Sequence, residues 1–155
     1  QVAVKMVEAS GGKAVIACAD IATLRRHHDG KAPEDMALYA HLLETALDPW
    51  MLESGGCIDV RIDDGRYDTR LNAMLRADVQ QSLGQWGKAT LEDSRRSAGI
   101  QIADVMANSW YQIGLAGPRS QRIRALMEPF VADGRIRPLI IQSVPDMAVP
   151  MKKPA

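Results

Sequence analysis

Residues 92–104 have the sequence EDSRRSAGIQIAD, which joins the end of an expected strand to the start of an expected helix. Asp93 follows the strand, a turn rich in Ser and Gly comes next, and the first turn of the helix carries Gln101 and Asp104. Carboxylates that come from a strand end and a helix start can converge on one point. Convergent carboxylates suit a divalent metal ion or a proton-transfer site. This junction therefore predicts an α/β fold with a candidate site beside it.

On both sides of this junction, the spacing of apolar residues predicts further strands and helices. The spacing predicts strands over 2–7, 13–19, 57–62, 88–92 and 136–142, and helices over 20–26, 33–47, 69–83, 100–113 and 120–132. Pro49 is expected to end the second of these helices, and Asp68 to cap the third. The turn at Ser10, Gly11 and Gly12 predicts a hairpin between the first two strands. The fold class is therefore α/β, with a mixed β-sheet flanked by helices in a single domain (1–143) and a Pro-rich tail (144–155).

Composition is that of an ordinary globular protein. The 155 residues are 46% hydrophobic and 25% charged. No apolar run reaches the roughly 20 residues of a membrane helix, and no basic start leads into an apolar stretch, so neither a membrane span nor a signal peptide is expected. Cys18 and Cys57 have no close Cys partner and are expected to be buried free thiols of a reducing compartment, which predicts a cytoplasmic location. Because the chain begins with Gln1, we expect that it lacks its original N-terminus.

Charge is unevenly placed although the net charge is +0. Residues 1–93 hold 10 Lys/Arg and 15 Asp/Glu, whereas residues 94–155 hold 9 Lys/Arg and 4 Asp/Glu. A basic half beside an acidic centre suits an anionic polymer such as nucleic acid. The alternative is that these charges lie on solvated faces. The sequence leaves the oligomeric state open.

The candidate metal ligands are three carboxylates. Asp63, at the end of the strand 57–62, and Asp93 and Asp104 would hold Mg²⁺ or Mn²⁺. Asp64 or Asp59 could replace Asp63. The alternative for the acids is structural, with Asp93 or Ser94 capping a helix and the rest forming a solvated polar face.

Polar and basic residues around these acids are candidate substrate groups. Gln101 and Asn108 lie at helical spacing from Asp104, three residues before it and four after it, and so share its helix face. Arg95 and Arg96 lie between Asp93 and Asp104, where a phosphate would approach. These four residues are predicted to bind substrate.

Other kinds of site have little support. His27, His28 and Asp29 are consecutive and point in different directions, so a surface loop is the better interpretation. The sequence contains no nucleophile elbow, phosphate-binding loop or dinucleotide-binding glycine motif.

The stretch from Asp93-Ser94 through Gln101-Ile102-Ala103-Asp104 and the helix up to Tyr111 resembles the C-terminal signature of the domain-of-unknown-function family 3800. Over residues 13–142 the Asp63 strand and the Tyr39 helix also follow the order of that family. The resemblance implies a ribonuclease H-like fold, a metal-dependent nuclease site, and a phage or mobile-element context. It also implies that Asp63, Asp93 and Asp104 are the site acids and that Gln101 is a motif residue.

One departure from the family pattern concerns the first strand, which usually bears an Asp-Glu-Ser-Gly motif. Glu8-Ala9-Ser10-Gly11 is only superficially similar and lies in the expected hairpin turn. Either that strand is missing from this chain or this chain has lost a principal acid.

Three functions remain as hypotheses. The leading one is a metal-dependent nuclease or phosphodiesterase that hydrolyses a nucleic-acid backbone. The second is a non-catalytic binding or assembly module of the same fold, in which the Asp cluster is structural. The third is hydrolysis of a small phosphate ester or nucleotide.

Overall fold

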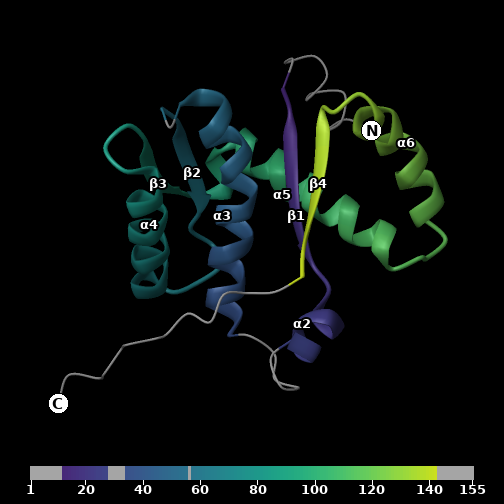
Figure 1. The fold of residues 1–155 in the computed structure, drawn as a ribbon, viewed down its shortest axis with the longest axis horizontal. Helices are drawn as coiled ribbons and strands as arrows, with labels where there is room; N and C mark the ends of the chain where they lie inside the picture. The colour runs from purple at the N-terminus through teal and green to yellow at the C-terminus, as the bar shows by residue number, and fades with distance from the viewer. Residues whose placement is uncertain (1–11, 28–33, 56, 143–155) are drawn as a thin grey trace.

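The protein is described by a computed structural model that covers residues 12–27, 34–55 and 57–142. The elements in chain order are β1 (Ala14–Ala19), α2 (Ile21–His27), α3 (Asp35–Ser54), β2 (Asp59–Asp63), α4 (Thr69–Leu83), β3 (Lys88–Glu92), the 3₁₀ turn η1 (Ser94–Arg96), α5 (Ala98–Gly114), α6 (Ser120–Ala132) and β4 (Ile136–Ile141) (Figure 1). The architecture is α/β, as predicted. The expected first strand (2–7), its hairpin turn and the Pro-rich tail lie outside the described residues.

The described strands form two separate pairs, both parallel. In one, β1 pairs with β4, from Ala14 opposite Ile136 to Ala19 opposite Ile141. In the other, β2 pairs with β3, and Asp63 lies opposite Glu92. The sequence predicted one mixed sheet, so this arrangement differs from the prediction. Parallel strands need a long crossover, which α4 supplies between β2 and β3.

The pair β2–β3 packs against α3 and α4. Along β2 the buried residues Val60 and Ile62 alternate with exposed Asp59 and Arg61, as the sequence predicts. The buried face of α4 contributes Leu75, Val79 and Leu83 to this first core cluster. Asp68 caps α4 by accepting a hydrogen bond from the Leu71 backbone N–H at 2.9 Å, which confirms the predicted cap.

The pair β1–β4 packs against α5 and α6 and builds a second core cluster. Its buried residues are Ile16, Met106, Ile113, Met127 and Ile136. The short helix α2 builds a small third cluster, in which Leu24 is fully buried beside Ile141. Asp20 caps α2 through the Ala22 backbone N–H and the Thr23 hydroxyl, at 3.0 and 2.6 Å. The polar turn before α2 is therefore satisfied locally.

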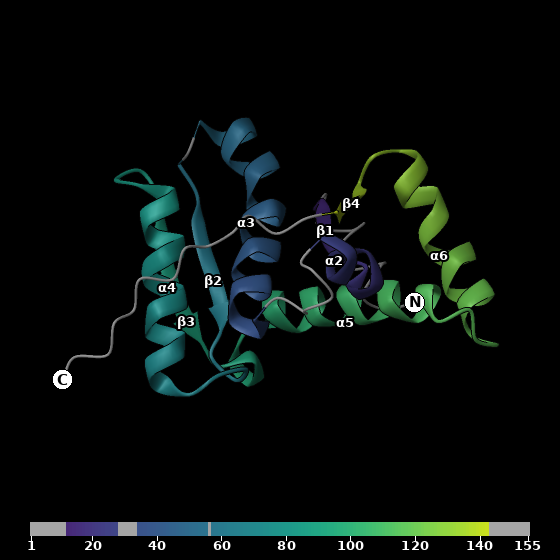
Figure 2. The ribbon, with the colours of Figure 1, turned by 60° about the horizontal axis from the view of Figure 1, so that its bottom comes forward.

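Two helices connect the strand pairs. Helix α3 contacts α4 on one side and β1 and β4 on the other, and α5 contacts both β1 and β2. Figure 2 shows α5 starting near the lower ends of β2 and β3, running beneath β1 and β4, and leading on to α6. The N-terminal end of α5 therefore comes close to the end of β2, where Asp63 lies.

Helix α3 is longer than the sequence predicts. It continues through Pro49 to Ser54 and ends at Gly55, which adopts a left-handed conformation with φ of 65°. Pro49 was expected to end the helix, and this prediction is wrong. The last turn packs Met51, which is partly buried, against the first core cluster, and this packing favours the helix although Pro49 cannot donate a backbone hydrogen bond.

The remaining elements follow the predicted ranges closely. Strand β3 and helix α6 match 88–92 and 120–132, and β1, β2, α4, α5 and β4 agree within two residues at each end. Cys18 is half-buried, whereas Cys57 is exposed, which corrects the expectation that both thiols are buried. Within the described ranges, no helix has the length and apolar character needed to cross a membrane.

Candidate functional site

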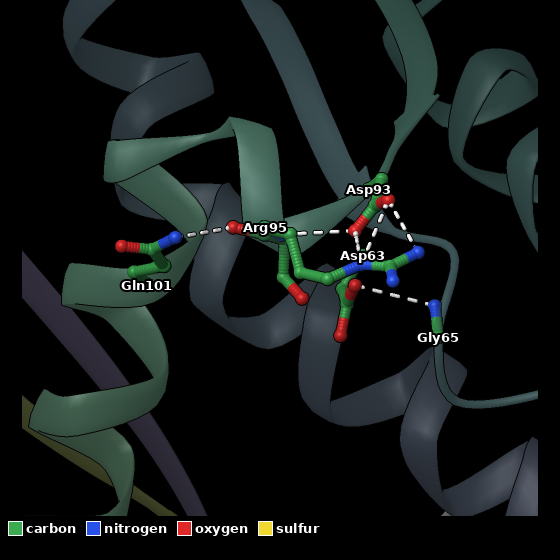
Figure 3. Close-up of polar contacts among 6 residues, drawn as sticks. Asp63, Gly65, Asp93, Arg95 and Gln101 are labelled. Carbon is green, nitrogen blue, oxygen red and sulfur yellow. Dashed lines mark hydrogen bonds and ion pairs between the residues drawn. The ribbon is translucent and has the colours of Figure 1, made fainter.

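Asp63 ends β2 and leads into a tight turn. Since β3 runs parallel to β2, the Asp64 backbone N–H donates to the Glu92 carbonyl at 3.2 Å and keeps the two strand ends together. The Asp63 carboxylate accepts a hydrogen bond from the Gly65 backbone N–H at 3.2 Å (Figure 3). The half-buried Asp63 side chain is thus held at the edge of the strand pair.

Asp93 comes from the neighbouring strand end and is already engaged. It caps η1 by accepting from the Arg95 backbone N–H at 2.9 Å. The Arg95 guanidinium also donates Nε at 3.0 Å and Nη2 at 2.8 Å to this carboxylate (Figure 3). These hydrogen bonds hold the pKa of Asp93 below its usual range. The guanidinium is the larger cause and the backbone N–H is the next. This is the capping role that the sequence offered as the alternative to metal binding.

Asp104 lies in the second turn of α5 and is exposed. It lines the same cavity as Asp63, with a volume of about 750 Å³, between the end of β2, α3 and the start of α5. Arg61, Arg66 and Arg96 also line this cavity. Two of the predicted acids therefore share one cavity with three arginines.

The third acid does not line that cavity. Among the described residues, no group of three or more His, Cys, Asp or Glu side chains is placed to hold a metal ion. Asp63 and Asp104 are the two carboxylates of this cavity that could bind a hard cation of the Mg²⁺ type, which is usually held through one or two carboxylates, water and substrate phosphates. Asp93 could join them only if it exchanged Arg95 for the metal.

The four residues that were predicted to bind substrate lie in different surroundings. Arg96 lines the cavity, whereas Arg95 is paired with Asp93. The Gln101 side chain donates Nε2 to the Ser94 carbonyl at 2.8 Å, and in Figure 3 it lies away from Asp63 and Asp93. It therefore ties η1 to α5 in this structure. Asn108 is exposed on α5 and is not among the residues that line the cavity.

The sequence analysis missed an arginine held between two tyrosines. The Arg66 guanidinium lies 4.7 Å from the ring centroid of Tyr39 and 5.4 Å from that of Tyr67. Its Nε donates to the Tyr67 hydroxyl at 3.1 Å, and its Nη2 pairs with Asp35 at 3.3 Å. The Tyr67 hydroxyl in turn donates to Asp35 at 2.8 Å. Arg66 and Tyr39 line the cavity, so this cluster forms part of its wall.

A buried amide holds the loop that carries Arg66. Asn72, from the first turn of α4, donates Nδ2 to the backbone carbonyls of Asp64 and Tyr67 at 2.7 and 2.8 Å.

The two tyrosines beside Arg66 are neutral. Burial raises the pKa of Tyr39 and of Tyr67, so both hydroxyls stay protonated at neutral pH. A clue lay in the sequence, where Arg66 and Tyr67 directly follow the expected Asp63 strand and its Gly65 turn.

Comparisons with protein-family models, curated proteins and solved structures gave no match to this chain. The predicted resemblance to the domain-of-unknown-function family 3800 therefore stays a prediction.

Proposed function

We propose that the protein is a metal-dependent phosphodiesterase or nuclease that acts on a nucleic-acid backbone. One observation supports this proposal above the others: Asp63 and Asp104, from the end of β2 and the start of α5, line one cavity together with three arginines. Carboxylates that can bind a cation beside groups that can bind phosphate are the combination that phosphodiester hydrolysis uses. The proposal includes the ribonuclease H-like architecture and a Mg²⁺ or Mn²⁺ ion.

Each side chain has a distinct part in this proposal. Asp63 and Asp104 would hold the metal ion, which when bound supplies a nucleophilic hydroxide and stabilises the leaving oxygen. The arginines attract the polyanionic substrate and hold its phosphate against the two acids. Asp93 has a conditional part, because its carboxylate is available only when Arg95 moves to another partner such as the substrate phosphate.

The second candidate function is a non-catalytic nucleic-acid-binding or assembly module. The ion pair between Asp93 and Arg95 favours it, because this pair and the Gln101 hydrogen bond to Ser94 give two motif residues a structural role without any metal. The cavity and its arginines would then bind phosphate without cleaving it.

The deciding experiment is cleavage of end-labelled single- and double-stranded DNA and RNA in Mn²⁺. Asp104→Asn removes one ligand charge while keeping the side chain's size, and Asp78→Asn makes the same change at an exposed position on α4 outside the cavity. We expect cleavage by the wild type and by Asp78→Asn, and its loss in Asp104→Asn. A mononucleotide substrate in parallel identifies hydrolysis of small phosphate esters.

Melting temperatures separate the two candidate functions if no cleavage is seen. A metal site predicts that Mn²⁺ raises the melting temperature of the wild type and not that of Asp104→Asn, since a ligand that binds only the folded state stabilises it. If Mn²⁺ changes neither protein, the nuclease proposal is refuted and the acids are structural.

A further inference from the structure

Arg66 is the most firmly positioned of the three cavity arginines. Stacking against Tyr39, together with the contacts to Tyr67 and Asp35, fixes the plane of its guanidinium. The Arg61 side chain, in comparison, is 66% exposed and has a single ion-pair contact with Glu92 at 3.4 Å. A preorganised guanidinium loses less conformational entropy when it binds a phosphate, and Nη1, which none of these contacts uses, is left to donate to it.

The rest of the cavity wall is largely apolar. Leu43 of α3 and Ile100, Ala103 and Ala107 of α5 line it between the charged groups. An apolar wall beside a cationic rim matches the two parts of a nucleotide, a flat base and a phosphate. A volume of about 750 Å³ lies within the range of roughly 300–1,000 Å³ that is common for small-ligand sites.

Resting on the function proposed above, we propose that this cavity accepts one unpaired nucleotide of a single-stranded nucleic acid, with Arg66 binding its phosphate. The base lies against the apolar side of α5, and Arg66 sets the phosphate beside Asp63 and Asp104. A duplex keeps the faces of its bases stacked, so only an unpaired or extruded nucleotide can offer a base to this wall. The substrate class is therefore single-stranded, and a blunt duplex is a poor ligand.

The test measures binding separately from cleavage. Fluorescein-labelled single-stranded oligonucleotides of DNA and of RNA, and a blunt duplex of the same length, are titrated in EDTA and followed by anisotropy. We expect the single strand to bind more tightly than the duplex. Arg66→Ala should weaken single-strand binding about tenfold, the effect of losing one charge-assisted contact. It should also make the slope of log affinity against log salt shallower by about 0.7.

Three further variants make the result specific. Arg70→Ala removes the same charge from an exposed position at the start of α4 and should change affinity by less than about twofold. Arg66→Lys keeps the charge but not the planar fork, so it should recover the salt slope and only part of the affinity. Ala103→Leu fills the apolar wall at an exposed helix position, and should weaken single-strand binding with the melting temperature unchanged.

The outcomes distinguish this inference from the nuclease proposal. Equal binding of single strand and duplex, or an unchanged affinity in an Arg66→Ala protein that melts like the wild type, overturns the inference even if cleavage depends on Asp104. If Arg66→Ala itself lowers the melting temperature, Ala103→Leu is the test, and an unchanged single-strand affinity in that variant overturns the inference. Arg66-dependent binding of single strands, without cleavage by the wild type and without any rise of its melting temperature in Mn²⁺, supports the inference and refutes the nuclease.

Discussion

Three amide side chains tie loops to neighbouring helices. Asn72 holds the loop after β2, and Gln101 holds η1. Gln80 spans the turn between α4 and β3, donating to the Gly84 and Gly87 carbonyls and accepting from the Ala89 backbone N–H at 2.9 Å. A primary amide both donates and accepts, so it can satisfy loop backbone groups that have no partner in a helix or sheet.

Asn72→Ala should destabilise the protein because it removes two hydrogen bonds to loop carbonyls. Asn72 is 4% exposed, and its loss leaves the carbonyls of Asp64 and Tyr67 without their hydrogen-bond donor. We expect the free energy of unfolding in urea to fall by about 1–3 kcal/mol. Asn108→Ala, at an exposed helix position, is the matched control and should stay within about 0.5 kcal/mol of the wild type. Equal effects of the two substitutions on the free energy of unfolding would show that the Asn72 hydrogen bonds do not stabilise the protein.

Arg95→Ala should raise the pKa of Asp93 toward its usual range. The guanidinium is the largest cause of the lowered pKa, and the backbone N–H of residue 95 remains, so the rise should be incomplete. Because the folded-state pKa is lowered, the stabilisation that the carboxylate provides is present above about pH 4 and is lost as the pH falls through the folded value. Carboxyl ¹³C NMR titration measures the pKa. Arg96→Ala should raise it less, and a larger rise there would contradict the assignment.

At the scale of single residues, contacts within a few positions could be predicted and side-chain contacts across the fold could not, whereas the expected ends of the elements did place two distant acids together. The Asp68 cap was predicted because its donor, the Leu71 N–H, is three residues away. The Arg66 cluster was missed because Asp35 and Tyr39 reach it from α3, and nothing in the local sequence shows that approach. Asp63 and Asp104 were proposed to lie at one site on the basis of their expected elements, and the structure brings them to one cavity.

Helix α3 shows how packing can override a local signal. Thr45, four residues before Pro49, lacks the usual backbone donor from position 49, and the helix nevertheless continues for more than a turn beyond it. The Thr45 hydroxyl donates to the His41 carbonyl at 2.8 Å, a bond within the helix. The sequence prediction gave too much weight to proline because the burial of Met51 is a tertiary effect.

Pro49→Ala should stabilise the protein. Alanine restores a helical N–H opposite the Thr45 carbonyl and removes the clash of the ring, a gain of up to about 3 kcal/mol. The more flexible unfolded chain offsets up to about 1 kcal/mol of this gain. We expect a rise of roughly 1–3 kcal/mol in the free energy of unfolding, measured by urea titration. Pro118→Ala, in the loop before α6, should give no gain. A loss of stability in Pro49→Ala would show that the proline ring packs usefully.

The described part of the chain holds two large core clusters, which α3 and α5 join, and a small third cluster of Leu24 and Ile141. The elements were predictable because periodicity is local, but the pairing of strands was not. β1 pairs with β4, which is almost the whole described chain away, and β2 pairs with β3. Strand order depends on which apolar faces meet across the fold, and the same apolar runs would also fit a single sheet. The ribonuclease H-like topology is therefore still a prediction.

The bridging helices predict that the two clusters unfold together. Leu75→Ala in the first cluster removes a side chain that is 1% exposed and should cost about 2–5 kcal/mol. In a protein that also carries Trp50→Phe and Trp86→Phe, Trp110 is the sole tryptophan and reports on the second cluster. We expect its fluorescence midpoint in urea to shift as far as the midpoint seen by far-UV circular dichroism.

The matched control for this experiment is Leu52→Ala in the same background. Leu52 is 85% exposed near the end of α3, so its loss should move both midpoints by the equivalent of less than about 0.5 kcal/mol. If Leu75→Ala shifts the circular dichroism midpoint but leaves that of Trp110 in place, the clusters unfold independently. The contacts of α3 and α5 would then be too weak to couple them. A cavity built between β2, α3 and α5 would in that case lose its shape before the second cluster melts.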